Sequence, residues 1–270
     1  MTKILAVMSQ KGGVGKTTTS VNLAASIAAL EMRTLLIGID PQCGVSSSFN
    51  FSKRENKYGI YNLLYYKVPI VEVIIHSEIK FLDVIVSNVN SSSEEEILNQ
   101  TMKANKFYLK EILAEVKKFY DYIILDCPPS LGAISISTMI AADSILIPVQ
   151  GEYYSKASLA RLLQTAREVS SMYNPSLTIE GVLLTMVDFR TNLGRRVCED
   201  IRRAMGEKVF STIIPRTVKL AEAPMTKKPV ILSDINSKGA MAYLSLAQEI
   251  IAKDEEKKNN GEGITLQGKV

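Results

Sequence analysis

The chain has 270 residues, 46% of them hydrophobic and 22% charged, and a formal net charge of +4 at neutral pH. This composition permits a large buried core and excludes a largely disordered protein. No apolar run approaches the roughly 20 residues of a membrane-spanning helix. The first apolar stretch is too short for a signal peptide, so we expect a cytoplasmic protein.

Short β-type runs alternate with longer helical runs along the chain, a pattern typical of an α/β fold whose mostly parallel, twisted sheet is covered by helices on both faces. The runs are continuously apolar, as in strands buried on both sides. We predict strands over Ile4–Met8, Thr34–Ile39, Leu82–Val86, Tyr122–Leu125, Ser144–Val149, Gly181–Met186 and Val209–Thr212, and helices that include Thr17–Leu30, Ser155–Met172 and Arg195–Met205.

No linker or repeat divides the sequence, which predicts a single domain over residues 1–252. From Lys253 the chain becomes polar and loses periodicity, so residues 253–270 are predicted to form a flexible tail. Three separated cysteines and one histidine form no metal-binding or disulfide pattern. We interpret Cys43, Cys127 and Cys198 as buried free thiols, and His76 as structural.

A glycine-rich loop follows the first predicted strand and leads directly into a helix. Such a loop turns its backbone N–H groups toward phosphate oxygens, and the helix adds its positive end. Lys16 can reach the β- and γ-phosphates of a nucleotide, and the Thr17 hydroxyl can bind Mg²⁺. A plain strand–helix connection is the alternative, which the Gly-Lys-Thr ending disfavours. The predicted nucleotide-binding residues are Lys11, Gly12, Gly13, Val14, Gly15, Lys16, Thr17 and Thr18.

The loop carries a second cation, Lys11, and has Gln10 where the usual phosphate loop has its first glycine. Lys11 could bind phosphates in its own chain or reach into the site of a partner subunit, as an arginine finger does. The spacing alone leaves both roles open.

Two carboxylates follow predicted buried strands. Asp126 ends the run Tyr122–Leu125, at the sheet edge where ligands of α/β proteins bind, and is suited to support Mg²⁺ from the second coordination shell. Asp40 ends Thr34–Ile39 and could orient the attacking water.

Several ordered motifs over residues 1–252 resemble the ParA/MinD family of deviant Walker A ATPases, and most of all its short chromosomal partitioning members. The matching segments are Lys11–Thr17, Asp40–Gln42, Asp126–Ser130, Pro148–Gln150, Glu152–Tyr154, Arg190–Leu193, Ile214–Arg216, Leu220–Pro224 and Ser237–Ala240.

The resemblance implies a P-loop ATPase that binds ATP and Mg²⁺ and closes into a homodimer around nucleotide. Lys11 would cross to the partner's phosphates, Gly12 would lie where two subunits approach, and Asp40 would serve hydrolysis. Lys11, Lys16 and Asp40 are thus the implied catalytic residues, and Pro215 joins the nucleotide-binding set. The dimer would bind double-stranded DNA without sequence preference, on the nucleoid, and a ParB-like activator would stimulate hydrolysis during chromosome or plasmid segregation.

Three positions depart from the family pattern. Gly38 replaces a usual aspartate, Cys43-Gly44 replaces Gly-Asn, and Lys219 replaces a common arginine. The first two lie beside Asp40 and bear on the rate of hydrolysis.

Between Asp188 and Lys228 the chain has ten cationic and five anionic side chains, a net +5. Local salt bridges on a solvated face are one interpretation, and a phosphate-binding surface is the other. In the resembling proteins the positions of Arg190 and Lys219 contribute to DNA binding, which favours the second.

Other functions remain open. An ATPase that positions protein cargo on the nucleoid would share these motifs, as would a nucleotide-locked DNA-binding scaffold with negligible turnover. A MinD-like membrane ATPase needs an amphipathic tail with an apolar stripe, which residues 253–260 lack. An iron–sulfur carrier would need paired cysteines.

Overall fold

A computed structural model describes residues 2–52, 57–151 and 156–260. These residues form one eight-stranded sheet in the order β3-β4-β2-β5-β1-β6-β7-β8. Neighbouring strands are parallel except for the antiparallel pair β3–β4. The strands are β1 (Lys3–Val7), β2 (Thr34–Gly38), β3 (Ile75–His76), β4 (Leu82–Ile85), β5 (Tyr122–Asp126), β6 (Ser144–Gln150), β7 (Thr178–Val187) and β8 (Val209–Pro215).

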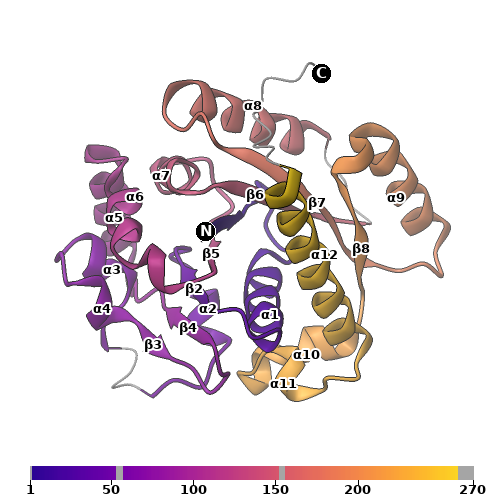
Figure 1. The fold of residues 1–270 in the computed structure, drawn as a ribbon, viewed down its shortest axis with the longest axis horizontal. Helices are drawn as coiled ribbons and strands as arrows, with labels where there is room; N and C mark the ends of the chain where they lie inside the picture. Colours follow the sequence, from indigo (N-terminus) through magenta and orange to yellow (C-terminus); the bar gives the residue numbers. More distant parts are fainter. Residues whose placement is uncertain (1, 53–56, 152–155, 261–270) are drawn as a thin grey trace.

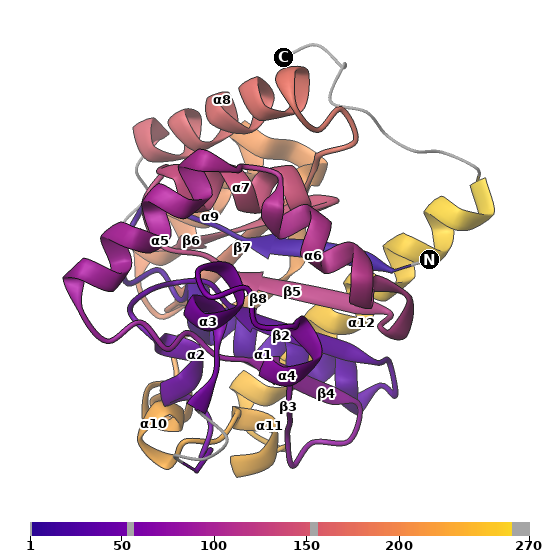
Figure 2. The ribbon, with the colours of Figure 1, turned by 90° about the vertical axis from the view of Figure 1, so that its left-hand side faces the viewer.

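Helices cover both faces of the sheet (Figure 1). They are α1 (Lys16–Ala29), α2 (Gly44–Ser47), α3 (Ile60–Leu64), α4 (Ile70–Val73), α5 (Ser92–Ala104), α6 (Tyr108–Val116), α7 (Ala133–Ala141), α8 (Lys156–Met172), α9 (Asn192–Met205), α10 (Val218–Thr226), α11 (Val230–Ser233) and α12 (Lys238–Asn260), with short 3₁₀ helices η2 (Lys117–Phe119) and η3 (Gly206–Lys208). Figure 2 shows α5 to α8 on one side of the sheet and α1, α10, α11 and α12 on the other.

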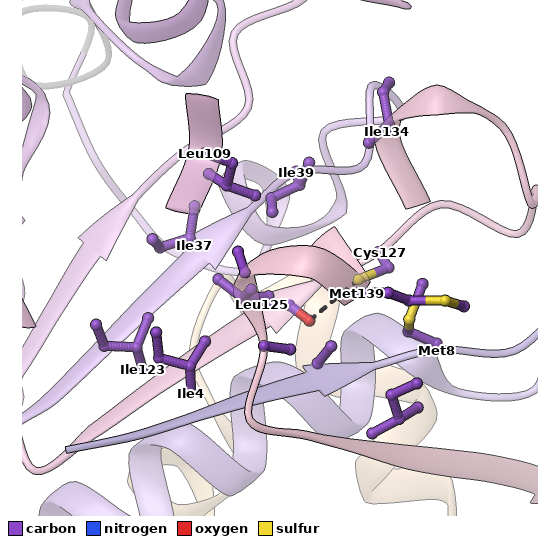
Figure 3. Close-up of a cluster of buried hydrophobic side chains, with 14 of the residues drawn as sticks. Ile4, Met8, Ile37, Ile39, Leu109, Ile123, Leu125, Cys127, Ile134 and Met139 are labelled. Carbon is purple, nitrogen blue, oxygen red and sulfur yellow. Dashed lines mark hydrogen bonds between the residues drawn. The ribbon is translucent and has the colours of Figure 1, made fainter. Parts of the chain in front are cut away.

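Each face of the sheet has its own hydrophobic core, because successive side chains of a strand point to opposite faces. Ile37 of β2 and Leu125 of β5 belong to the core under α5 to α9, where Figure 3 shows them beside Leu109 and Met139. Leu36 belongs to the core under α1 and α12. The sheet is therefore buried on both faces, as its continuously apolar strands predict.

The predicted α/β class and all seven predicted strands are confirmed, with ends shifted by up to three residues. The additional strand, β3, has only two residues, which is too short for a sequence pattern to reveal. The predicted helix start at Ser155 lies outside the described residues, as does the Glu152–Tyr154 motif.

The predicted flexible tail is wrong for residues 253–260, because α12 continues to Asn260. Its polar side chains have partners on the sheet: the Asp254 carboxylate accepts hydrogen bonds from Lys3 Nζ at 2.5 Å and from the Tyr122 hydroxyl at 2.9 Å. Ionic and hydrogen-bond contacts with the sheet thus stabilise a helical segment that the hydrophobic periodicity of the sequence does not indicate. Residues 261–270 lie outside the described chain.

A buried carboxylate lies at the centre of this contact. The Glu180 side chain on β7 is 0% exposed, and its Oε2 lies 2.6 Å from Lys3 Nζ. Lys257 Nζ lies 3.9 Å from Oε1, although neither oxygen has a well-oriented hydrogen bond within the described residues. Burial alone would raise the pKa of Glu180, but Lys3 and Lys257 hold it below its usual value of 4.5.

We expect Glu180→Ala to lower the free energy of unfolding by about 3 kcal/mol at pH 7, because it leaves two cations without their buried partner. Since the pKa of Glu180 is depressed in the folded state, its contribution is complete above pH 4.5 and disappears as the pH falls through the lower folded value. Urea denaturation of wild type and variant at pH 7, and again at a pH below the folded pKa of Glu180, measures the difference in the free energy of unfolding. The exposed Glu207→Ala is the control, and equal losses for the two variants would contradict the ionic role.

Candidate functional site

The phosphate loop connects β1 to α1 at the carboxyl edge of the sheet. Gly13 and Gly15 have φ values of +72° and +87°, a region that L-residues with side chains rarely adopt. On β7, the Thr185 hydroxyl donates a 2.8 Å hydrogen bond to the carbonyl oxygen of Val14. The loop is thereby held in a turn that ends at the positive end of α1, which suits it to bind an anion.

Lys16 begins α1 and is buried within the loop. Its Nζ donates to the carbonyl oxygen of Lys11 at 3.2 Å. Burial lowers the pKa of Lys16, and the charges of Asp126 and Asp40 act in the opposite direction. A buried ammonium group between a loop carbonyl and two carboxylates lies where the terminal phosphates of a nucleotide would meet it.

Asp126 is fully buried at the end of β5. Its Oδ2 accepts a 2.8 Å hydrogen bond from the Thr17 hydroxyl, and its Oδ1 accepts one of 2.8 Å from the Ser20 hydroxyl. Burial raises the pKa of Asp126 to about 7, against the lowering effect of these hydrogen bonds. The oxygen-rich pair of Thr17 and Asp126 fits a hard cation such as Mg²⁺ next to the phosphate loop.

Asp40 follows β2, the neighbour of β5 in the sheet. The backbone N–H groups of Ile39 and Asp40 donate to the carbonyl oxygen of Asp126 at 3.0 and 3.2 Å. The Asp40 Oδ1 accepts the Gln42 N–H at 3.0 Å, and the residue is 8% exposed. The two acidic residues predicted from separate strands are thus brought together.

Two of the three departures from the family pattern, Gly38 and Cys43-Gly44, pack tightly around the turn at Asp40. A Cβ on Gly38 would lie 2.9 Å from that of Val45, and a Cβ on Gly44 would lie 2.9 Å from Thr17 Oγ1. Cys43 has a φ of +55°, and its Sγ lies 3.3 Å from the carbonyl oxygen of Val89. The turn therefore packs the start of α2 against Thr17, the residue that we expect to bind the metal.

Sequence reasoning missed Ser20, Gly44 and Thr185 as supports of the site. Ser20 lies one helical turn after Lys16, and this spacing could have indicated a shared face. The roles of Gly44 and Thr185 depend on contacts between distant segments, for which the sequence carries no local pattern.

The remaining predicted site residues lie along the same edge. Pro215 ends β8 beside Val187 of β7. A Cβ on Gly12 would meet no atom within 4 Å, so packing within one chain does not require glycine there. A cavity of about 240 Å³ opens beside Thr17 and Thr18, between α1, α2, α10 and the segment that precedes α11.

Arg190 and Lys219 are exposed in the segments after β7 and β8. The Arg190 guanidinium group makes a bidentate contact with Asp188, with Nη2 at 2.6 Å from Oδ2. This hydrogen bonding lowers the pKa of Asp188 to about 2. The arginines of α9 are also exposed, at Arg195, Arg196, Arg202 and Arg203.

The three cysteines are free, as predicted, and Cys127 and Cys198 are buried, but the predicted burial is wrong for Cys43, which is only partly buried. His76 Nδ1 pairs with Asp83 on the neighbouring strand at 2.7 Å. Over the described ranges, no helix is both long and apolar enough to span a membrane.

A glycine loop between β1 and α1, a hydroxyl-bound carboxylate on the adjacent strand and a mostly parallel sheet define a P-loop nucleotide-binding protein. The family model described as an AAA domain matches residues 2–179. The chain is 46% identical to the sporulation initiation inhibitor protein Soj of Bacillus subtilis, over 93% of this chain and 99% of that one. It is 43% identical to the chromosome partitioning protein ParA of Myxococcus xanthus, over 94% and 90% of the two chains.

Among solved structures, a cobyrinic acid a,c-diamide synthase of Mycobacterium smegmatis with bound ADP and magnesium is similar, with a TM-score of 0.80 and 27% identity over 99% of this chain and 100% of that one. The chain belongs to the ParA/MinD family of deviant Walker A ATPases and is close to chromosomal ParA.

Proposed function

We propose that this protein is an ATP- and Mg²⁺-dependent ATPase that dimerises around nucleotide, binds DNA without sequence preference and drives chromosome or plasmid segregation with a ParB-like activator. The observation that carries the proposal is the constellation of Lys16, Thr17, Asp126 and Asp40 at one sheet edge. Similarity to partitioning proteins over more than nine-tenths of the chain supports the biological role. Such a protein would act in the cytoplasm, on the nucleoid.

In this proposal the loop N–H groups and Lys16 bind the β- and γ-phosphates. Thr17 would be a ligand of Mg²⁺, which would neutralise charge on the phosphates, and Asp126 orients the Thr17 hydroxyl. Asp40 would position or polarise the attacking water. Lys11 of each subunit completes the other subunit's site, which couples hydrolysis to dimerisation.

Gly12 lies in the phosphate loop and, in this proposal, also where two subunits approach. A Cβ at this position would meet no atom of the single chain within 4 Å, so its steric effect must come from the nucleotide or from a second subunit. We expect Gly12→Val to remain a monomer with ATP, and its ATP affinity separates a clash with a second subunit from a clash with the nucleotide. Calorimetry and sedimentation measure the two properties, and a normal ATP-bound dimer would contradict the assigned interface.

The proposed DNA-binding surface is formed by Arg190, Lys219 and the exposed arginines of α9. Arg190 is paired with Asp188 but its side chain is 90% exposed, so it can still contact a phosphate. Contacts of this kind position a protein on DNA without reading sequence, and their strength falls steeply with salt.

We expect Arg190→Glu with Lys219→Glu to weaken DNA binding by at least about tenfold while ATP-dependent dimerisation is retained. Affinity for duplex DNA should be measured across a salt series with ATP, with ADP and without nucleotide. Lys103→Glu, an exposed charge reversal on α5, is the matched control. Unchanged retention on DNA at low salt would exclude this surface, and equal binding in all nucleotide states would contradict the proposed cycle.

A further inference from the structure

A bulge interrupts β7, which lies between β6 and β8 in the sheet (Figure 1). From Leu184 to Val187 the strand advances three residues while its partner β8 advances two, so Thr185 and Met186 together lie opposite one residue. Leu184 and Val187 consequently belong to the same hydrophobic core, although side chains three positions apart in a regular strand point to opposite faces. Bulges are rare in parallel pairs and occur next to active sites, where they redirect side chains. We name residues 185–186 the β7 bulge.

Both residues of the β7 bulge contact the phosphate loop. The Thr185 hydroxyl donates a 2.8 Å hydrogen bond to the Val14 carbonyl oxygen, and Met186 Cε lies 3.5 Å from where a Cβ on Gly15 would lie. Successive side chains of a regular strand could not reach the same loop, because they point to opposite faces. Met186 has a φ of +53°, a strained value for a residue with a side chain, and such strain persists where surrounding contacts enforce it. The conformation of the bulge is therefore tied to that of loop residues 14 and 15.

The segment after the β7 bulge carries one of the proposed DNA contacts. The Val187 carbonyl oxygen accepts the N–H of Arg216 at 3.1 Å, which joins the ends of β7 and β8. The Asp188 carbonyl oxygen accepts the N–H of Thr191 at 3.2 Å and its hydroxyl at 2.9 Å. The Asp188 carboxylate binds the Arg190 guanidinium group. These hydrogen bonds fix the turn over residues 188–191 to the end of β7, so a displacement of the bulge moves the turn that carries Arg190.

We propose that the β7 bulge positions the phosphate loop for nucleotide and links the occupied loop to the turn that carries Arg190. Thr185 binds the Val14 carbonyl and so directs it at β7, away from phosphates that its negative end would repel. Met186 transmits a change in loop shape, because its side chain contacts Gly15 and its backbone continues into the turn. The link to DNA binding rests on the proposed function, whereas the positioning of the loop rests on nucleotide binding alone.

The positioning role is tested at Thr185. Thr185→Val removes the hydroxyl but keeps the shape of the side chain, so we expect ATP to bind about tenfold more weakly, whereas Thr185→Ser should stay within about threefold of the wild type. Isothermal calorimetry with ATP and Mg²⁺ measures both affinities. Thr178→Val is the matched control, because the Thr178 hydroxyl donates to the Asp143 carbonyl at 3.4 Å at the other end of β7. Wild-type affinity in Thr185→Val, or an equal loss in Thr185→Ser or Thr178→Val, would overturn the positioning role.

The link is tested at Met186. Glycine adopts positive φ without strain and lacks the side chain that contacts Gly15, so Met186→Gly should uncouple the turn from the loop. Affinity for duplex DNA is measured with saturating ATP and without nucleotide. We expect ATP to raise the affinity at least about tenfold in the wild type and less than about threefold in Met186→Gly, with the ATP-bound dimer retained in sedimentation. Met172→Gly removes a methionine that is 60% exposed on α8, and this control should respond to ATP as the wild type does.

Three outcomes would contradict these expectations. A wild-type response to ATP in Met186→Gly would overturn the link. Loss of the ATP-bound dimer in this variant would also overturn it, because dimerisation would then account for the change in DNA affinity. If the DNA affinity of the wild type does not depend on ATP, the proposed function fails together with the link, and calorimetry on the Thr185 variants still decides the positioning of the loop.

Discussion

Replacement of Lys16 by alanine is expected to reduce ATP affinity by at least about 100-fold. The Lys16 ammonium group is buried inside the phosphate loop, and its charge-assisted contact with the terminal phosphates is worth about 3 kcal/mol. Lys16 is only 7% exposed, so its charge is poorly screened by solvent. Isothermal calorimetry with ATP and Mg²⁺ measures the affinity.

The control for this variant is Lys103→Ala, which removes an exposed lysine and leaves the phosphate loop unchanged. Circular dichroism should show that both variants are folded. ATP affinity within a few-fold of the wild type in Lys16→Ala would refute the assignment of residues 11–18 as the nucleotide site.

Asp40→Ala should bind ATP and dimerise normally but hydrolyse ATP about 100- to 1000-fold more slowly, as for other positioned general bases. The Asp40 carboxylate accepts the Gln42 N–H and is not hydrogen-bonded to Thr17 or Ser20, so its loss leaves the Thr17–Asp126 pair, which we expect to support the metal, intact. Single-turnover phosphate release measures hydrolysis, and gel filtration with ATP measures the dimer.

Asp40→Asn separates charge from hydrogen bonding, because the asparagine amide oxygen can still accept the Gln42 N–H. It should be as slow as Asp40→Ala if the negative charge activates the water. Normal turnover in both variants would show that another group handles the water. Loss of ATP binding in both would instead indicate that Asp40 supports the loop.

The sequence was sufficient to predict the features that depend on local chemistry. Continuously apolar runs predict the buried strands, and the glycine-rich segment predicts a turning loop before α1, in which Gly13 and Gly15 have positive φ. The position of Asp126 after a buried strand predicts its proximity to Thr17, because carboxyl ends of parallel strands meet at one edge.

The features that the sequence did not reveal depend on distant partners. The helical segment after Lys253 has no apolar stripe, and its stability comes from Lys3, Tyr122 and Glu180 on three separate strands. Likewise, the need for glycine at position 44 appears only when the Thr17 side chain is placed beside it. Such pairings are properties of the assembled fold and leave no periodic pattern.

The contact between Lys3 and Asp254 joins the first strand to the last helix across 251 positions. A nascent chain therefore lacks this contact at the amino end of its central strand until Asp254 has emerged from the ribosome. Loops of this length close slowly, and the exposed charges and strand edges must stay soluble in the meantime. The last turns of α12 thus set the moment at which this contact can form during synthesis.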